Sequence, residues 1–271
     1  MEHPTENLCF QMVKKVEENF SGTLRLLGML PTSRMEFRDG SLCVSTGVSI
    51  ADQNFVWGCL EEDLESGILR AVSFFQQERV PFTWWISPFT NFQDLRKALA
   101  RKGLKERCTP PAMALDLISQ NSSAELPPSV TVRVASSLED ARTWARCSLK
   151  GFSSGSEHER TFSAFAEGFL RVSIGQSFRL LTLLYEKSPA ATALISFIEE
   201  TAGLYFFSTV PAFRRKGLGR MLLSRCIEEA RSAGCSLMTL QASPDGYPLY
   251  LGAGFRECFR FSVFSSDPDA C

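Results

Sequence analysis

One short stretch of the chain gathers residue types that bind phosphate. It follows Pro211 and combines cationic side chains with two glycines. The cations are Arg214, Arg215, Lys216 and Arg220, and the glycines are Gly217 and Gly219. Glycine lets the main chain lie close to a ligand, and the first amides of a following helix are unpaired and lie at the positive end of its dipole. The stretch therefore predicts a diphosphate site, with cations to match the negative charge.

Two other kinds of phosphate loop fit this stretch less well. A P-loop needs Gly-Lys-Ser/Thr after its glycines, whereas Lys216 precedes Gly217 here. The dinucleotide pattern G-x-G-x-x-G needs a third glycine where this chain has Leu222. A nucleotide hydrolase and a hydride-transfer enzyme are therefore disfavoured.

The elements that must position this stretch are predicted from hydrophobic periodicity and turn signals. The predicted strands of the C-terminal half are 131–135, 178–185, 191–198, 204–209, 236–242 and 255–264. The predicted helices are one ending near residue 148, then 217–233 and 245–253. The strands on either side of the 217–233 helix should be parallel within an otherwise antiparallel sheet. The fold class is therefore α/β, with a mixed sheet.

Two segments of the C-terminal half resemble motifs of a known family. Arg214-x-x-Gly217-x-Gly219 is similar to the coenzyme A signature R/Q-x-x-G-x-G/A of the GNAT superfamily of N-acetyltransferases. Residues 248–255 resemble the family's L-Y-x-x-x-G-F element. The resemblance covers nearly all of the C-terminal half and implies a GNAT fold that binds acetyl-CoA.

The resemblance also implies which residues contact acetyl-CoA. In the family, the strand before the signature bulges, pairs with the pantetheine arm and points an N–H at the thioester carbonyl; Thr209 and Val210 stand there. The main chain over 215–220 would hold the pyrophosphate, and Ser243 replaces a frequent Asn that contacts the cofactor. The implied cofactor-binding set is Thr209, Val210, Arg214, Arg215, Lys216, Gly217, Leu218, Gly219, Arg220 and Ser243.

For catalysis, Tyr250 occupies the position of the family's frequent general acid, which protonates the departing thiolate. Tyr247 is the neighbouring alternative, and either ring could instead be an aromatic packed on the sheet. The general base stays open between His158, ordered water and the pair Glu199 and Glu200, which also fits a solvated turn.

The N-terminal half repeats part of this pattern. Both halves hold a strand closing on Ser-Pro, then a helix ended by Gly and an apolar residue. Superposing the two Ser-Pro pairs places the acidic run 61–63 where the C-terminal half has Gly217 to Gly219, and carboxylates there would repel a pyrophosphate. We therefore expect a degenerate GNAT-like domain at 1–120 that shapes or covers the acceptor site, a linker at 121–129 and the acetyltransferase domain at 130–271.

Net charge, apolar run length and the cysteine and histidine counts disfavour several classes of function. A net charge of −1 and a pI near 6.2 provide no field for nucleic acid. The chain begins without a leader pattern and holds no apolar run long enough to span a membrane, so a cytoplasmic protein is predicted. Nine cysteines include no C-x-x-C pair and only two histidines occur, so we expect no metal.

The predicted function is an acetyl-CoA-dependent N-acetyltransferase acting on a primary amine of a small molecule or amino acid. The alternatives are a non-catalytic acyl-CoA binding or sensing module and an acetyltransferase for a protein amine. The amine itself and the oligomeric state are not readable from the sequence.

Overall fold

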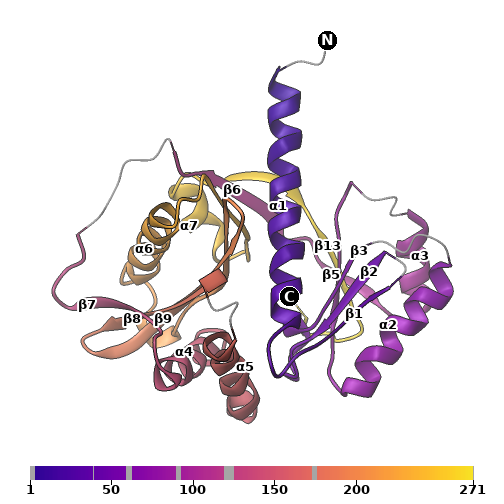
Figure 1. The fold of residues 1–271 in the computed structure, drawn as a ribbon, viewed down its shortest axis with the longest axis horizontal. Helices are drawn as coiled ribbons and strands as arrows, with labels where there is room; N and C mark the ends of the chain where they lie inside the picture. The colour runs from indigo at the N-terminus through magenta and orange to yellow at the C-terminus, as the bar shows by residue number, and fades with distance from the viewer. Residues whose placement is uncertain are drawn as a thin grey trace.

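A computed structural model describes residues 4–38, 40–58, 63–89, 93–118, 125–172 and 176–270. These residues form two β-sheets that lie on either side of one long helix, α1 (Pro4–Gly28) (Figure 1). In the part of the chain so described, no helix is long and apolar enough to cross a membrane.

The C-terminal sheet has seven strands in the order β12-β6-β11-β10-β9-β8-β7. In chain order these are β6 (Pro111–Asp116), β7 (Val130–Val134), β8 (Phe178–Tyr185), β9 (Ser188–Ile198), β10 (Thr201–Thr209), β11 (Leu237–Gln241) and β12 (Arg256–Arg260). Its helices are α4 (Leu138–Gly151), α5 (Glu159–Arg171), α6 (Leu218–Ser232) and α7 (Tyr247–Gly252). The β10–β11 pair is parallel and the other pairs are antiparallel, as predicted.

The N-terminal sheet has six strands in the order β1-β2-β3-β4-β13-β5. They are β1 (Arg34–Arg38), β2 (Ser41–Ser45), β3 (Phe55–Gly58), β4 (Thr83–Ile86), β5 (Lys105–Cys108) and β13 (Ser262–Ser265). The helices α2 (Leu64–Glu78) and α3 (Gln93–Arg101) belong to this half. Strand β3, helix α2 and strand β4 form a parallel unit like that of β10, α6 and β11, which matches the repetition seen in the sequence.

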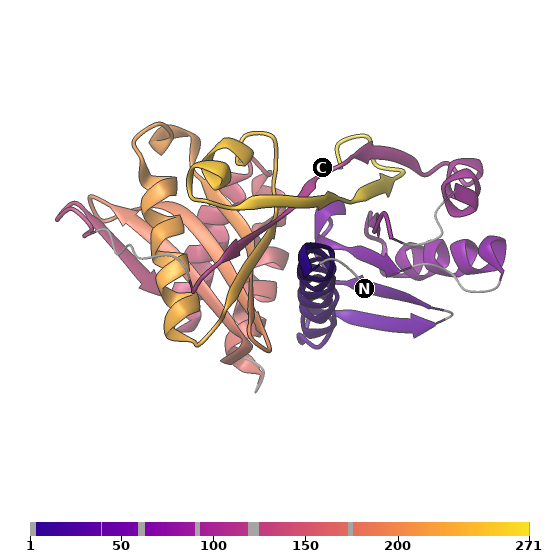
Figure 2. The same ribbon diagram turned by 90° about the horizontal axis from the view of Figure 1, so that it is seen from above.

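The two halves exchange their last strands. Strand β6 pairs with β11 and β12 in the C-terminal sheet, and β13 pairs with β4 and β5 in the N-terminal sheet (Figure 2). The prediction of one strand over 255–264 is therefore wrong: it divides at Phe261 into β12 and β13. The reason is tertiary, because the fully buried Phe261 ring packs against the rings of Phe20, Trp57 and Trp85 between the sheets.

Helix α1 is tied to the C-terminal sheet by buried polar contacts. The Asn19 side chain is fully buried; its Nδ2 donates to the carbonyl of Thr201 (2.9 Å), and its Oδ1 accepts from the Tyr205 hydroxyl (3.0 Å). A Cβ on Gly203 would lie 2.1 Å from Asn19 Oδ1, so only glycine permits this approach. The halves thus share strands and a helix contact, and the boundaries 1–120 and 130–271 remain predictions.

Candidate functional site

The predicted phosphate-binding stretch is an open helix start. Helix α6 begins after Gly217, which has φ 77° and no side chain to cap the helix, and Arg215 also has a positive φ of 62°. The first amide with a partner is that of Met221, which donates to the Gly217 carbonyl (3.1 Å). Among the described residues, the amides over 215–220 have no hydrogen-bond acceptor. Six consecutive N–H groups are therefore available to an anion.

The cations around this helix start divide into two kinds. Arg215, Lys216 and Arg220 are exposed, and the Lys216 ammonium lies 5.0 Å from the Tyr185 ring centroid. Arg214 is exposed too, but its side chain donates to the carbonyls of Thr209 and Gly151, each at 3.0 Å. The Arg214 side chain thus connects the end of β10 to the end of α4, and a cofactor contact by Arg214 remains a prediction.

Strand β10 opens away from β11 just before this stretch. The two strands pair over Thr201–Leu204 of β10, which continues to Thr209 with one edge unpaired by any described residue. In this open part the register with β9 slips between Tyr205 and Ser208, so that Phe206 and Phe207 together face one residue of β9. This is a β-bulge, and its main-chain groups lie beside the gap between the strands.

The bulge lies earlier than the positions predicted to meet the thioester. Val210 already donates its amide to the carbonyl of Ala190 (2.9 Å), and the Thr209 carbonyl accepts from Arg214. The Val210 N–H is therefore occupied. Phe206 and Phe207, which the sequence reasoning did not single out, are the residues at the bulge, and nothing in their apolar pattern distinguishes them from ordinary strand residues.

Tyr250 lies beneath the bulge. Its ring is 5% exposed and packs against Phe207 (centroids 5.9 Å apart) and Phe255 (5.7 Å). Burial raises the pKa of the Tyr250 phenol well above its ordinary value, so the hydroxyl is a neutral proton donor at physiological pH. Tyr247 differs, because its hydroxyl donates to the Glu257 carboxylate (2.9 Å), which raises its pKa.

Gly219 joins the helix start to the bulge and to α7. A Cβ at this position would lie 3.5 Å from Thr209 Oγ1, 3.6 Å from Leu249 Cδ2 and 4.0 Å from Phe207 Cε1. The free amides, the bulge and the Tyr250 helix therefore converge on one place at the C-terminal ends of β10 and β11.

Ser243 begins the turn into α7. Its hydroxyl accepts from the amide of Gly246 (3.2 Å), and its carbonyl accepts from the amide of Tyr247 (2.9 Å). The hydroxyl is exposed but engaged locally, so a cofactor contact by Ser243 remains a prediction.

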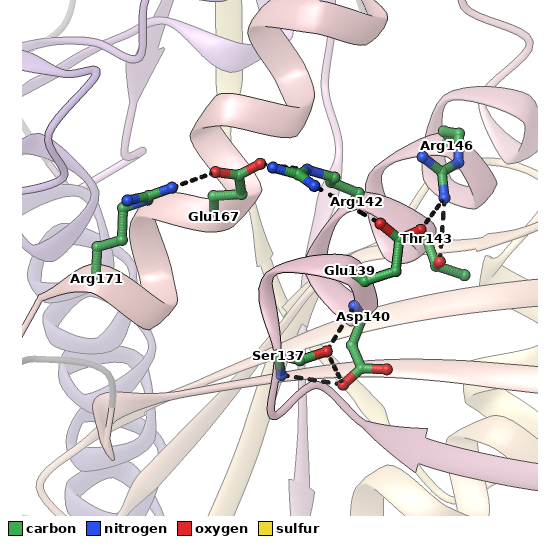
Figure 3. Close-up of polar contacts among 8 residues, drawn as sticks. All are labelled: Ser137, Glu139, Asp140, Arg142, Thr143, Arg146, Glu167 and Arg171. Carbon is green, nitrogen blue, oxygen red and sulfur yellow. Dashed lines mark hydrogen bonds and ion pairs between the residues drawn. The ribbon is translucent and has the colours of Figure 1, made fainter.

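Helices α4 and α5 pack on Phe206 of the bulge through Trp144, Phe162 and Phe165. Charged side chains join the two helices (Figure 3). The Glu167 carboxylate of α5 accepts from Arg142 of α4 (2.6 Å) and from Arg171 (2.7 Å). These hydrogen bonds, first that of Arg171, lower the pKa of Glu167. The capping box of Ser137 and Asp140 starts α4. The helix pair is thus held as one unit over the bulge.

The candidate bases lie in different places. His158 is in the short 3-10 turn Ser156–His158 between α4 and α5, with Nε2 3.4 Å from Glu157. Glu199 and Glu200 form the exposed turn before β10, at the opposite end of that strand from the bulge. The described ranges contain no group of three or more His, Cys, Asp or Glu that could hold a metal ion.

The equivalent helix start in the N-terminal half is closed. Asp63 caps α2, and its Oδ1 accepts from the amides of Glu65 (3.1 Å) and Ser66 (3.2 Å). Glu61 and Glu62, the other two acids of the predicted run, lie outside the described residues.

Part of this chain matches a known protein family, and its fold is similar to solved structures. Residues 139–255 match the family model described as the acetyltransferase (GNAT) family. No curated protein matches the sequence. Similar solved structures include a GCN5-related N-acetyltransferase from Kribbella flavida, 15% identical, with a TM-score of 0.67 over 93% of this chain and 96% of that one.

Two further structures extend the likeness over both halves. One is a GCN5-related N-acetyltransferase from Sphaerobacter thermophilus, 13% identical, with a TM-score of 0.62 over 92% of this chain and 86% of that one. The other is a tandem GNAT protein from the clavulanic acid biosynthesis pathway, 14% identical, with a TM-score of 0.57 over 93% and 88%. At such identities the likeness shows the fold, and the predicted fold class is confirmed.

Proposed function

We propose that this chain, whose residues 139–255 match the acetyltransferase (GNAT) family, transfers the acetyl group of acetyl-CoA directly to a primary amine of a small molecule or amino acid. The observation that carries this proposal is the run of amides over 215–220, which have no acceptor in the described part of the chain and lie beside the gap between β10 and β11. These amides would hold the diphosphate, with Arg215, Lys216 and Arg220 adding charge. The pantetheine arm would follow the unpaired edge of β10.

The reaction needs a donor for the carbonyl oxygen and a proton for the departing sulfur, and we assign these roles to two groups of this site. The amine nitrogen attacks the thioester carbonyl carbon, negative charge builds on the carbonyl oxygen, and the C–S bond then breaks. A main-chain N–H at the Phe206–Phe207 bulge would donate to that oxygen. Tyr250, which its raised pKa keeps protonated in the resting site, would donate a proton to the departing sulfur as the C–S bond breaks. The proton lost by the amine would pass to His158 or to ordered water.

The test is release of free thiol from acetyl-CoA in the presence of a panel of amines. We expect Tyr250→Phe to lower kcat by about 10²–10⁴-fold, the usual value of a positioned proton donor. Tyr247→Phe is the matched control, because the Tyr247 hydroxyl is hydrogen-bonded to Glu257 at the exposed side of α7. This variant should keep the wild-type rate. Calorimetry with coenzyme A should give the same affinity for all three proteins.

Each outcome has a distinct meaning. Equal rates for wild type and Tyr250→Phe would remove Tyr250 from the mechanism. Binding of coenzyme A without turnover of any amine would favour a non-catalytic acyl-CoA sensing module, and turnover only with peptides would favour a protein amine. No heat with coenzyme A or acetyl-CoA would refute the proposal.

A further inference from the structure

The bulge in β10 has a conformation that its own residues disfavour. Phe206 has φ 48°, in the left-handed region that bulky side chains rarely adopt. Such a conformation persists only when surrounding contacts impose it, and it is typical of places where the backbone must present a particular group. The contacts around Phe206 therefore indicate which residues control the main chain at the bulge.

Strand β9 holds the bulge from one side. Thr192 Oγ1 donates to the Phe206 carbonyl (3.3 Å), and the hydroxyls of Thr192 and Ser208 are 3.0 Å apart. Thr192 and Ser208 are paired across the strands directly after the register slip. The fully buried Thr192 side chain thus spans the irregular step of β10.

Helix α4 holds the bulge from the other side, through Trp144. The indole N–H donates to the carbonyl of Ala193 (2.9 Å), and Ala193 lies on β9 between the partners of Tyr205 and Ser208, opposite the bulge. The indole ring also packs against the Phe206 ring, with centroids 5.6 Å apart at 66°. Trp144 is fully buried, so one rigid side chain contacts both the bulged residue and the strand that faces it.

We propose that Trp144, together with Thr192, is a positioning residue for acyl transfer: it fixes the β10 bulge so that a main-chain N–H meets the thioester carbonyl. The inference rests on the proposed function. A hydrogen bond that polarises a carbonyl requires the donor to be fixed before the reaction, because a donor that must reorient loses its advantage. Trp144 does not touch the acetyl group in this account and acts only through the strand.

The N-terminal half contains a matched control. Trp84 is also fully buried, and its indole N–H donates to the Gly58 carbonyl at the end of β3 (3.3 Å). Trp84 thus makes an indole–carbonyl hydrogen bond like that of Trp144, but in the N-terminal sheet, where Asp63 caps the helix α2. Replacing either tryptophan by phenylalanine removes one indole–carbonyl hydrogen bond and keeps an aromatic ring.

The experiment is isotope-edited infrared spectroscopy of acetyl-CoA labelled with ¹³C at the carbonyl carbon, bound to the full chain. A hydrogen-bonded thioester carbonyl absorbs at lower frequency than the free thioester. We expect that lowering in the wild type and in Trp84→Phe, and its partial loss in Trp144→Phe. Coenzyme A affinity, measured by calorimetry, should be unchanged in Trp144→Phe, because the amides over 215–220 lie on a different element.

Thr192→Val is the second variant if Trp144→Phe does not fold, since it removes both hydroxyl contacts at nearly constant volume. It should shift the carbonyl frequency in the same direction. A wild-type frequency in both Trp144→Phe and Thr192→Val, or an equal shift in Trp84→Phe, would overturn the inference while leaving the proposed function intact. Absence of acetyl-CoA binding by the wild type would instead overturn the proposed function, and this inference with it.

Discussion

Two helix starts in this molecule occupy equivalent places and have opposite properties. Helices α2 and α6 each connect two parallel strands, β3 to β4 and β10 to β11. Helix α2 is capped by Asp63, whose carboxylate accepts from the amides of Glu65 and Ser66. Helix α6 starts at Gly217, which has no side chain to satisfy its amides. A single residue type at the N-cap thus separates a helix start that serves stability from one that is open to an anion.

The strands before the two helices differ in the same sense. Strand β3 pairs with β4 through Trp57, one residue before it ends at Gly58. Strand β10 parts from β11 after Leu204 and continues to Thr209 with a bulge. A long acyl donor needs an unpaired strand edge as well as free amides, and among the described residues only the C-terminal unit has both.

The largest expected effect is the loss of the C-terminal fold when the N-terminal half is removed. A chain of residues 130–271 lacks β6, so β11 and β12 would each lose a strand partner and expose unpaired edges. We expect aggregation and no cooperative thermal transition by circular dichroism. Co-expressing residues 1–129 should restore the fold by supplying β6. A monomeric 130–271 fragment that melts cooperatively and binds coenzyme A would contradict this expectation.

The next largest effect should come from giving α6 a carboxylate. At about 4 Å, two unit charges near a protein surface interact by about 4 kcal/mol, so Gly219→Glu should weaken coenzyme A binding by about 10³-fold in calorimetry. Gly219→Ala is the control, because its Cβ would make ordinary contacts of 3.5 Å or more with Thr209 and Leu249. If both variants bind equally well, the diphosphate lies elsewhere.

The smallest effect concerns the closed helix start. Asp63→Ala should lower the Tm by about 2–4 °C through loss of the α2 cap. The Ser66 hydroxyl, then the Ser66 amide, lower the pKa of Asp63. A depressed folded-state pKa adds stability above the unfolded pKa of about 3.9 that is lost on acidification, so the gap between wild type and variant should close below about pH 4.

The number of coenzyme A molecules that Asp63→Ala binds per chain also tests the difference between the two helix starts. Coenzyme A should still bind at one molecule per chain in Asp63→Ala, because β3 is paired with β4 through Trp57 and, in the described part of the chain, lacks an unpaired stretch like Tyr205–Thr209 of β10. A second binding event in calorimetry would mean that the cap alone keeps the N-terminal half from holding the ligand.

The elements around the signature were predictable because local pattern and tertiary fold agree there. The apolar spacing of 217–233, ending in Gly234, corresponds to α6 at Leu218–Ser232, and the β-prone run 178–185 is β8 at the same bounds. The strand predicted at 255–264 was not divided correctly, since its apolar residues continue through Phe261 without a turn signal. Only packing between the two sheets separates β12 from β13 there.

The site shows the same division. The glycines, the cations and Tyr250 are recognisable from their residue types and their spacing. The sequence alone therefore determined that α6 has an open, cationic start with a tyrosine downstream. Tertiary structure decided that Arg214 binds carbonyls, that the bulge falls at Phe206, and that Trp144 holds it. The physical reason is range: helix starts and glycine conformations depend on neighbours along the chain, whereas a hydrogen bond from Trp144 to Ala193 exists only after distant segments have packed.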